Sequence, residues 1–165
     1  MSKTVKALLH CSAVCNIWVE RFLAALGITM ALVVILQVIC RYVFNSSLFW
    51  SEELARYMLV WLAFLGTSSG YHRKIHPSID ILPGNLKKIT ALGIVLAGHV
   101  IAMCFFVVMI YHGTIFAYFV RLQISPALAL PKWIIFSIIP LSGCLLLLHC
   151  LAFLSSDIAA HRHDR

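Results

Sequence analysis

The chain has 165 residues, of which 62% are hydrophobic and only 12% are charged, and its mean hydropathy is +0.96. This composition excludes a soluble globular domain and indicates an integral membrane protein. The formal net charge of +7 does not indicate a nucleic-acid partner, because the basic residues are spread between apolar segments.

The first segment, residues 4–20, is predicted to form an amphipathic helix lying on the cytoplasmic membrane surface. At helical spacing its polar residues Lys6, His10, Asn16 and Glu20 share one face, and the other face is apolar. A frayed cytoplasmic tail is the alternative interpretation. A cleaved signal peptide is not favoured, because no small-residue cleavage site follows.

Four segments then follow that suit a bilayer, which a helix of about 20 apolar residues spans. We expect membrane helices at residues 22–44, 51–71, 89–117 and 132–155. Pro140 lies inside the last helix and should kink it, because proline removes a backbone hydrogen bond. The predicted fold is an all-α integral membrane protein, a single membrane domain over residues 1–165 with four transmembrane helices and an N-terminal interfacial helix.

The basic residues predict the topology. If the N-terminus is cytoplasmic, nine Lys and Arg residues lie on the cytoplasmic side and four on the opposite side. This is the positive-inside pattern, so both termini are expected in the cytoplasm. Arg73 and Lys74 would anchor the cytoplasmic loop that they begin. His76 and Asp80 in this loop have no metal-ligand spacing, and no metal site is predicted.

The start of the second membrane helix is unusually charged. Ser51 is predicted to cap it, and Glu52 and Glu53 complement the positive end of the helix dipole. Glu52 is also four residues before Arg56 and is expected to pair with it. A capped and anchored helix start therefore explains these charges. The alternative is a periplasmic docking surface for a partner.

Two histidines, His99 and His149, fall inside membrane helices at similar predicted depths. Such a pair raises the hypothesis of a haem with two histidine ligands, although hydrogen bonds between helices are the favoured interpretation. The centres of the four predicted spans contain no Asp, Glu, Lys or Arg. Transporters that move ions by themselves need such residues there, so we expect this chain to act beside another protein. The six cysteines form no CxxC motif and are expected to be structural.

Several short motifs carry a resemblance to one family. They are Arg41-Tyr42-Val43-Phe44-Asn45, Trp50-Ser51-Glu52-Glu53-Leu54-Ala55-Arg56-Tyr57, Trp61-Leu62-Ala63-Phe64-Leu65-Gly66, Arg73 with His76 and Asp80, Ser125-Pro126-Ala127-Leu128, and Pro131-Lys132-Trp133 with Pro140. With these motifs the chain resembles the small membrane subunit, of the DctQ and SiaQ type, of tripartite ATP-independent periplasmic (TRAP) transporters. Pro77 departs from the family pattern, which more often continues there as an extended alternating segment.

The resemblance implies an auxiliary scaffold subunit of a sodium-coupled symporter in a bacterial inner membrane, importing an organic acid such as a dicarboxylate or sialic acid. Its partners would be a large multi-helix membrane subunit, forming a heterodimer, a periplasmic substrate-binding protein and membrane lipids. No catalytic residue and no cofactor are expected. Candidate partner-interface residues are Glu52, Glu53, Arg56, Tyr57, Trp61 and Gly66. Two alternatives remain: a haem-binding anchor of a respiratory enzyme, using His99 and His149, and a stand-alone homodimeric exporter.

Overall fold

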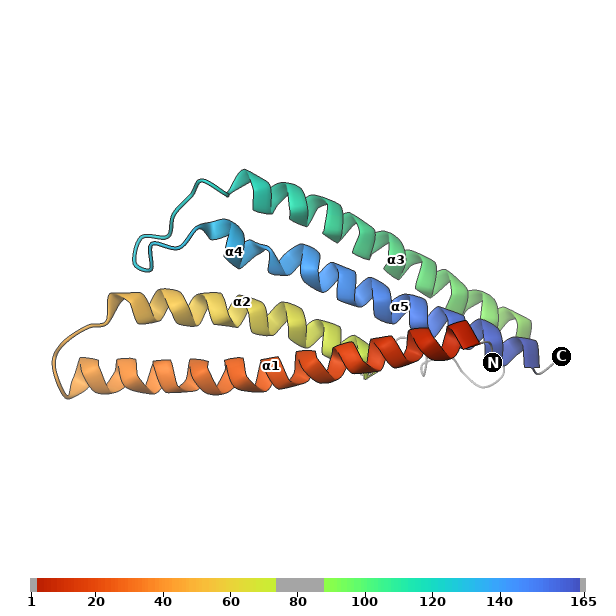
Figure 1. Ribbon diagram of the computed structural model, residues 1–165, viewed down its shortest axis with the longest axis horizontal. Coiled ribbons are helices and arrows are strands. Elements are labelled where there is room, and N and C mark those ends of the chain that lie inside the picture. The colour runs from red at the N-terminus through yellow and green to blue at the C-terminus, as the bar shows by residue number, and fades with distance from the viewer. Residues whose placement is uncertain (1–2, 74–87, 164–165) are drawn as a thin grey trace.

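The computed structural model describes residues 3–73 and 88–163 and consists of helices joined by short connections (Figure 1). The helices are α1 (Lys3–Tyr42), α2 (Phe49–His72), α3 (Lys88–Phe119), α4 (Lys132–Phe136) and α5 (Ile138–His163). The described part contains no strand, only one isolated bridge between Ile124 and Pro131. The predicted all-α class is therefore confirmed.

Helix α5 is the centre of the bundle. It packs against α1, α2 and α3, and α1 and α2 pack against each other as an antiparallel pair (Figure 1). By contrast, among the described helices α3 packs its backbone only against α4 and α5. We call the end with the first turns of α1 and the last turns of α5 the terminal end. The opposite end, with residues 43–48 and 120–131, is the loop end.

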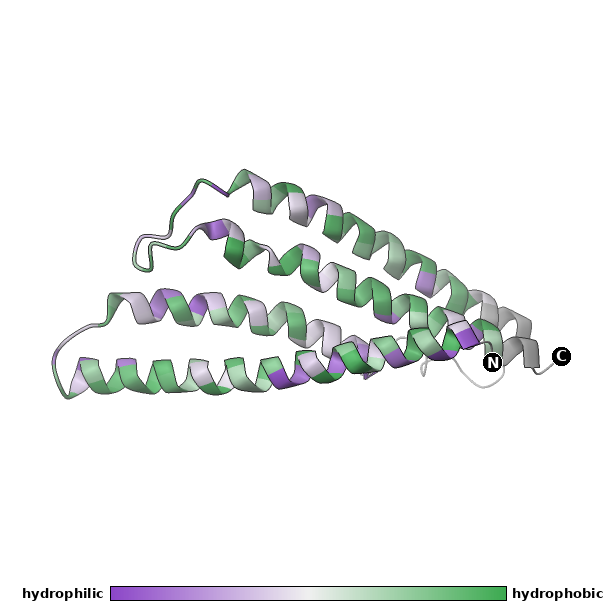
Figure 2. Cartoon of the chain, viewed as in Figure 1, coloured by the Kyte–Doolittle hydropathy of each residue, from purple (hydrophilic) through white to green (hydrophobic). Residues whose placement is uncertain are grey.

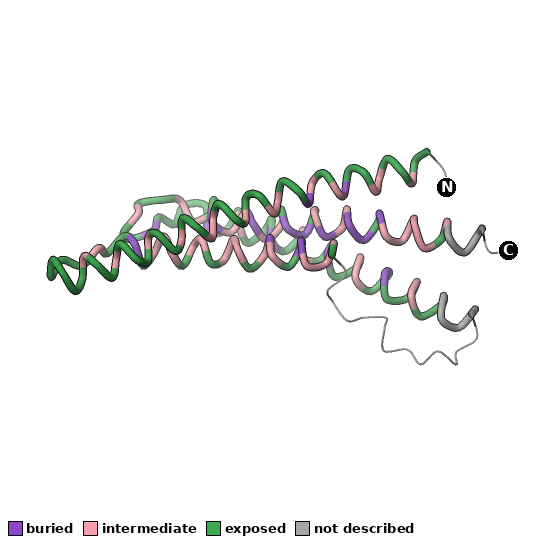
Figure 3. The backbone as a smooth tube through the Cα atoms, turned by 90° about the horizontal axis from the view of Figure 1, so that it is seen from below, coloured by how far each residue is buried: buried purple, intermediate pink, exposed green. Residues whose placement is uncertain are grey.

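The surface of the bundle is largely apolar, and its interior holds polar as well as apolar side chains. Figure 2 shows apolar residues along most of the length of the helices, and large apolar side chains of α1 and α3 are exposed, among them Ile28, Leu32, Ile101 and Phe105. The buried polar residues are Ser12, Asn16, Ser51, Ser68, Ser69, His99, Ser125, Ser142 and His149. This is the distribution expected in lipid, where polar groups turn inward to find partners. Figure 3 shows the buried positions gathered mainly on α5.

Three helical stretches are long and apolar enough to cross a membrane: Lys3–Tyr42, Gly93–Phe119 and Lys132–Ala159. Helix α2 has 24 residues, or about 36 Å at 1.5 Å per residue, which is also long enough for a span. Its first turns carry charges, however, and its last turns carry hydroxyl groups. A multi-pass membrane protein is thus supported, and the fourth span at residues 51–71 stays a prediction.

Residues 4–20 and 22–44, predicted as two helices, form one continuous helix instead. Helix α1 runs through Lys3–Tyr42 without a break, since no proline or other helix-ending signal separates the two segments. Asn16, on the face predicted to meet water, is buried in the bundle, whereas Trp18 on the apolar face is exposed. The helix ends at Tyr42, and three residues later Asn45 adopts a left-handed conformation with φ 49°.

The last membrane helix is divided at Ser137 into α4 and α5. Pro140 lies three residues later. Its ring removes the N–H that would bond to Phe136 and crowds the carbonyl of that residue, so the regular helix is interrupted one turn before the proline.

Helices α3 and α5 approach closely at two glycines. A Cβ atom added to Gly113 would lie 2.7 Å from Ile139 Cγ2 and 3.0 Å from Pro140 Cδ. One added to Gly143 would lie 2.8 Å from Ile110 Cγ1. By contrast, a Cβ added to Gly66 would meet nothing within 4 Å. Gly66 is therefore not used for helix packing within this chain.

Candidate functional site

Helix α2 begins two residues earlier than predicted. Its N-cap is Leu48, which has no side-chain capping bond, and the helix starts at Phe49. Ser51 was predicted as the N-cap, and this was wrong. The Ser51 hydroxyl instead donates a hydrogen bond to the Leu48 carbonyl at 2.7 Å, and the residue is completely buried.

Glu53 joins α2 to the connection between α3 and α4. Its Oε2 accepts hydrogen bonds from the backbone N–H of Ala127 at 2.7 Å and of Leu128 at 3.2 Å. Its Oε1 accepts a hydrogen bond from the Tyr57 hydroxyl, one turn along the same helix. Two of the predicted interface residues, Glu53 and Tyr57, are thus engaged within the chain.

The segment that Glu53 holds is itself a closed turn. Ser125 N–H donates to Leu130 C=O at 2.9 Å, and Ala129 N–H donates to Ser125 C=O at 3.1 Å. The Ser125 hydroxyl accepts the Leu130 N–H at 3.2 Å and is buried. Ala129 has a φ of 52°, which a residue with a Cβ adopts only at a cost in energy. The geometry of this turn is therefore imposed by its hydrogen bonds.

Glu52 and Arg56 remain at the surface. Glu52 Oε1 accepts a hydrogen bond from Gln37 Nε2 of α1 at 3.2 Å, and both charged residues are exposed. The predicted pairing of Glu52 with Arg56 was wrong, because neither side chain forms an ion pair among the described residues. The Trp61 ring packs against Phe22 of α1 with centroids 6.1 Å apart, so it is part of the α1–α2 contact.

A second polar cluster, near the terminal end, was not predicted. Glu20 Oε1 accepts hydrogen bonds from Asn16 Nδ2 at 2.7 Å, Ser69 Oγ at 3.1 Å and Arg73 Nε at 2.8 Å. Glu20 lies before the apolar stretch of α1. The hydrogen bond from Arg73, followed by that from Asn16, lowers the pKa of its carboxyl group. The sequence signal was present, since Asn16 and Glu20 are four residues apart on one face, but the partner of that face was not known.

The two membrane histidines have different partners. His149 Nδ1 lies 2.7 Å from Ser12 Oγ of α1. His99 Nε2 lies 3.0 Å from Asp157 Oδ2, and its Nδ1 lies 3.7 Å from Cys150 Sγ. Haem ligation requires two ring nitrogens that face each other across the iron, whereas both nitrogens of His99 already contact α5. This arrangement favours the interpretation of hydrogen bonds between helices and does not support the haem hypothesis.

No described group of His, Cys, Asp and Glu residues has the geometry of a metal site. The predicted loop residues Lys74, His76 and Asp80 lie outside the described residues, and Arg73 is the last described position before them. The six cysteines are free thiols in the structure.

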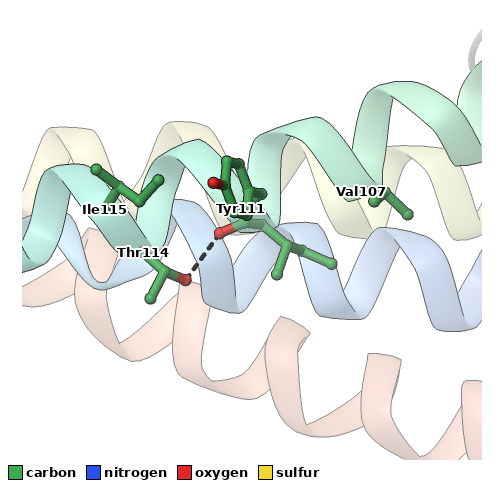
Figure 4. A pocket seen from close by; sticks show the side chains of 5 residues that line it. Val107, Tyr111, Thr114 and Ile115 are labelled. Atoms are coloured by element: carbon green, nitrogen blue, oxygen red, sulfur yellow. Dashed lines mark hydrogen bonds between the residues drawn. The ribbon is translucent and has the colours of Figure 1, made fainter.

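A shallow apolar hollow of about 360 Å³ lies on one face of α3 (Figure 4). Its lining residues are Val107, Ile110, Tyr111, Thr114 and Ile115. The Thr114 hydroxyl donates to the Ile110 carbonyl of its own helix at 2.7 Å, so it is already paired. The hollow has no charged lining residue and is part of the apolar surface of α3.

The family comparison decides the identity of the chain. Residues 30–160 match the family described as the DctQ component of tripartite ATP-independent periplasmic transporters. The chain belongs to this DctQ family. Glu53, the α3–α5 contact at Gly113 and Gly143, and His149 lie within the matched region, whereas Ser12, Asn16 and Glu20 precede it.

Three relatives show how far the similarity extends. The C4-dicarboxylate TRAP transporter small permease protein DctQ of Vibrio cholerae is 35% identical over 79 residues, which cover 45% of this chain and 34% of the relative. The protein of the same name from Rhodobacter capsulatus is 29% identical over 118 residues, covering 66% and 47%. The sialic acid TRAP transporter permease protein SiaT of Haemophilus influenzae is 38% identical over 73 residues, covering 42% and 11%. The chain therefore spans less than half the length of each relative.

Family membership and the apolar helices together indicate a multi-pass protein of the inner membrane and a TRAP transporter small permease component. Members of this family are transporter subunits rather than enzymes.

Proposed function

We propose that this chain is the scaffold subunit of a sodium-coupled TRAP transporter that imports an organic acid, such as a dicarboxylate or a sialic acid. It would form a heterodimer with a large multi-helix membrane subunit, which would carry the substrate and sodium sites. A periplasmic substrate-binding protein would deliver the substrate.

One observation carries the proposal: the long apolar stretches of the described helices, residues 22–40, 57–72, 93–119 and 133–156, contain no Asp, Glu, Lys or Arg. Glu20, Arg73 and Asp157 flank these stretches at their end toward the chain termini, and Glu52, Glu53 and Arg56 flank them at the loop end. Between these ends the described chain offers no ionisable Asp, Glu, Lys or Arg that would line an ion path. Coupling to an ion gradient would therefore be the task of another subunit, and a stand-alone exporter is disfavoured.

The relatives support a larger partner. In the SiaT protein of Haemophilus influenzae, the segment similar to this chain is only 11% of the whole sequence, so a related segment there belongs to a much longer permease chain. In this relative the similar segment is covalently joined to the rest of a longer permease chain. That arrangement is consistent with a non-covalent complex between this chain and a larger subunit.

The orientation follows from the charge distribution. We propose that four helices span the membrane, that the loop end faces the periplasm, and that both termini, with Arg73, Lys74, His76 and Asp80, are cytoplasmic. The exposed residues Glu52 and Arg56 would then lie where a periplasmic binding protein approaches. Gly66, which faces open space on α2, would permit close approach of a helix of the large subunit.

The test is a pull-down of the tagged chain, expressed from its own operon and purified in mild detergent, with an absorption spectrum of the eluate. We expect a colourless complex with a larger many-helix membrane protein in a constant ratio. Purification of the chain alone, or as a homodimer, would contradict the proposal. A Soret band that disappears in a His99→Ala variant would instead establish the haem anchor.

Transport measurements then test the role. Liposomes containing the large subunit and the binding protein should take up substrate only when this chain is also present. Uptake that is unchanged without this chain would exclude a required scaffold role.

A further inference from the structure

Three buried polar atoms have no hydrogen-bond partner among the residues that the structure describes. They are Asn16 Oδ1 of α1, Ser68 Oγ of α2 and His149 Nε2 of α5. The three residues are 5%, 0% and 0% exposed. Buried polar atoms in native proteins are almost always paired, with protein or with ordered water. Three unpaired atoms from three different helices therefore need a physical explanation.

The contacts around these atoms place them at one junction. Ser12 of α1 lies 2.7 Å from His149, and Asn16 is one turn further along the same face of α1. The ring of His72 on α2 lies 4.9 Å from the ring of His149, and Ser68 is one turn before His72. The residues with unpaired atoms therefore all belong to the meeting point of α1, α2 and α5.

Two further hydrogen bonds show that Asn16 of α1 lies close to α2. Glu20 Oε1 accepts from both Asn16 Nδ2, at 2.7 Å, and Ser69 Oγ, at 3.1 Å. One carboxylate oxygen thus bridges the Asn16 amide to the residue that follows Ser68. Since the other atom of the Asn16 amide group is its unpaired Oδ1, this acceptor lies within a few ångströms of α2.

We propose that this junction, formed by Asn16, Ser68 and His149, is a binding site for internal water that bridges α1, α2 and α5. Water satisfies an acceptor such as Asn16 Oδ1, a hydroxyl such as Ser68 Oγ, and a ring nitrogen in either tautomer, because it both donates and accepts. Polar internal sites hold water, whereas apolar ones stay dry. In a membrane protein such a bridge replaces direct contacts between helices, because lipid supplies no hydrogen bonds.

Water fits the three atoms better than a cation does. A cation requires every surrounding atom to be an acceptor, and His149 Nε2 is an acceptor only if Nδ1 carries the proton. If the Ser12 hydroxyl donates to Nδ1, then Nε2 is a donor and would repel a cation. Moreover, none of the three groups carries a negative charge.

The junction also has a route to bulk solvent. Glu20, one turn after Asn16 on α1, and Arg73, at the end of α2, border it, and their side chains are 32% and 57% exposed. Water at the junction can therefore exchange past this ion pair, even though His149 itself is completely buried.

The test is solid-state NMR of the full chain in liposomes, with histidine labelled by ¹⁵N, measuring magnetisation transfer from water to each imidazole. The His149 signal is assigned by its loss in a His149→Gln variant. We expect the His149 ring to receive magnetisation as fast as exposed His10. His99 should receive it slowly, because both its ring nitrogens have protein partners.

Three variants make the result specific. Ser12→Ala removes the exchangeable hydroxyl at Nδ1, and fast transfer to His149 should persist. Asn16→Leu and Ser68→Ala each remove a water partner, and at least one of them should slow the transfer to the His99 rate. The proposal is overturned if transfer to His149 is as slow as to His99 in the unchanged protein. It is also overturned if transfer is lost in Ser12→Ala, or if it is unaffected in both of the other variants.

Discussion

Glu53 Oε2 accepts a hydrogen bond from the backbone N–H of Ala127 at 2.7 Å, although the two residues are 74 positions apart. With the second bond from Leu128, this carboxylate fixes the connection between α3 and α4 onto the start of α2. The α3–α4 connection at the loop end is therefore held against α2 and is not independent of it. Any partner that docks there meets a surface whose form depends on Glu53 and whose exposed charges include those of Glu52 and Arg56.

Replacing Glu53 should consequently affect folding, whereas replacing Glu52 should not. In Glu53→Gln, the charged acceptor of two backbone donors becomes a neutral amide, and charge-assisted hydrogen bonds are the stronger ones. We expect a lower midpoint in thermal unfolding followed by tryptophan fluorescence. The matched Glu52→Gln variant loses only a bond to Gln37 at 3.2 Å and should unfold like the unchanged chain. Equal unfolding midpoints for both variants would mean that the hydrogen bonds of Glu53 contribute nothing to stability.

Charge reversal at the loop end tests docking separately from folding. Glu52→Lys and Arg56→Glu alter exposed side chains, so we expect normal membrane insertion and normal complex formation with the large subunit. Uptake of the substrate that the periplasmic binding protein delivers should fall in at least one of these two variants. Uptake at the unchanged rate in both variants would remove the docking role from these two residues.

Substitutions at two glycines distinguish helix packing within the chain from helix packing against a partner. Gly113→Ala places a Cβ 2.7 Å from Ile139 Cγ2, and such overpacking should destabilise the isolated chain by about 1–3 kcal/mol. Gly66→Ala meets open space and should leave the isolated chain unchanged. If α2 is a partner-facing helix, Gly66→Ala should instead reduce recovery of the large subunit in the pull-down. Destabilisation of the isolated chain by Gly66→Ala would contradict the structure directly.

The Ser12–His149 contact should be important for the position of α1. Ser12→Ala leaves a buried ring nitrogen without its partner, which costs about 1–3 kcal/mol. Thr29→Ala on the same helix is the control, because the Thr29 hydroxyl bonds only to the carbonyl of Ala25 and is exposed. The free energy of unfolding in a mild detergent series is the measurement. A loss for Ser12→Ala no greater than for the control would show that the contact does not hold α1.

The ion pair of Glu20 with Arg73 should make stability depend on pH. The pKa of Glu20 is lowered in the folded state from its ordinary value of 4.5, so the pair stabilises the fold above that pH. This contribution is lost progressively as the pH falls from 4.5 to about 2, where the carboxyl group of the folded chain becomes protonated. Unfolding midpoints measured across this range should therefore decline less in Glu20→Gln than in the unchanged chain. Parallel declines would assign the acid sensitivity to other groups.

The orientation of the bundle can be measured by cysteine labelling. In a variant without its native cysteines, Ser47→Cys at the loop end should react with an impermeant maleimide added outside the inner membrane. Lys3→Cys at the terminal end should react only after the membrane is opened. The reverse result would invert the proposed topology.

Much of the helical organisation could be predicted because it depends on local signals. The apolar stretches and the effect of Pro140 are each encoded within a few residues of where they act. The hydrogen bonds from Ala127 and Leu128 to Glu53 could not be predicted in this way. Their donors are backbone N–H groups, which every residue except proline has, and they lie on a distant loop whose position depends on the packing of α3 against α5.

The N-terminal segment was misread for a different reason. Its polar face was assigned to water, as it would be in a helix on the membrane surface. In the structure Lys6 and His10 of that face are exposed, but Asn16 packs into the bundle, where it bonds to Glu20, and the neighbouring Ser12 contacts His149. Periodicity identifies that a helix has two faces, but in a membrane protein the polar face is directed either to water or to other helices. The pattern alone does not distinguish these two environments.

The attachment of α3 to one side of the bundle has a consequence for assembly. Because its backbone packs only against α4 and α5, most of the circumference of α3 is solvated by whatever surrounds the protein. A protein that covers this helix must first displace acyl chains from it. Its affinity is then an exchange equilibrium, set as much by the chain length and the amount of lipid present as by the two protein surfaces.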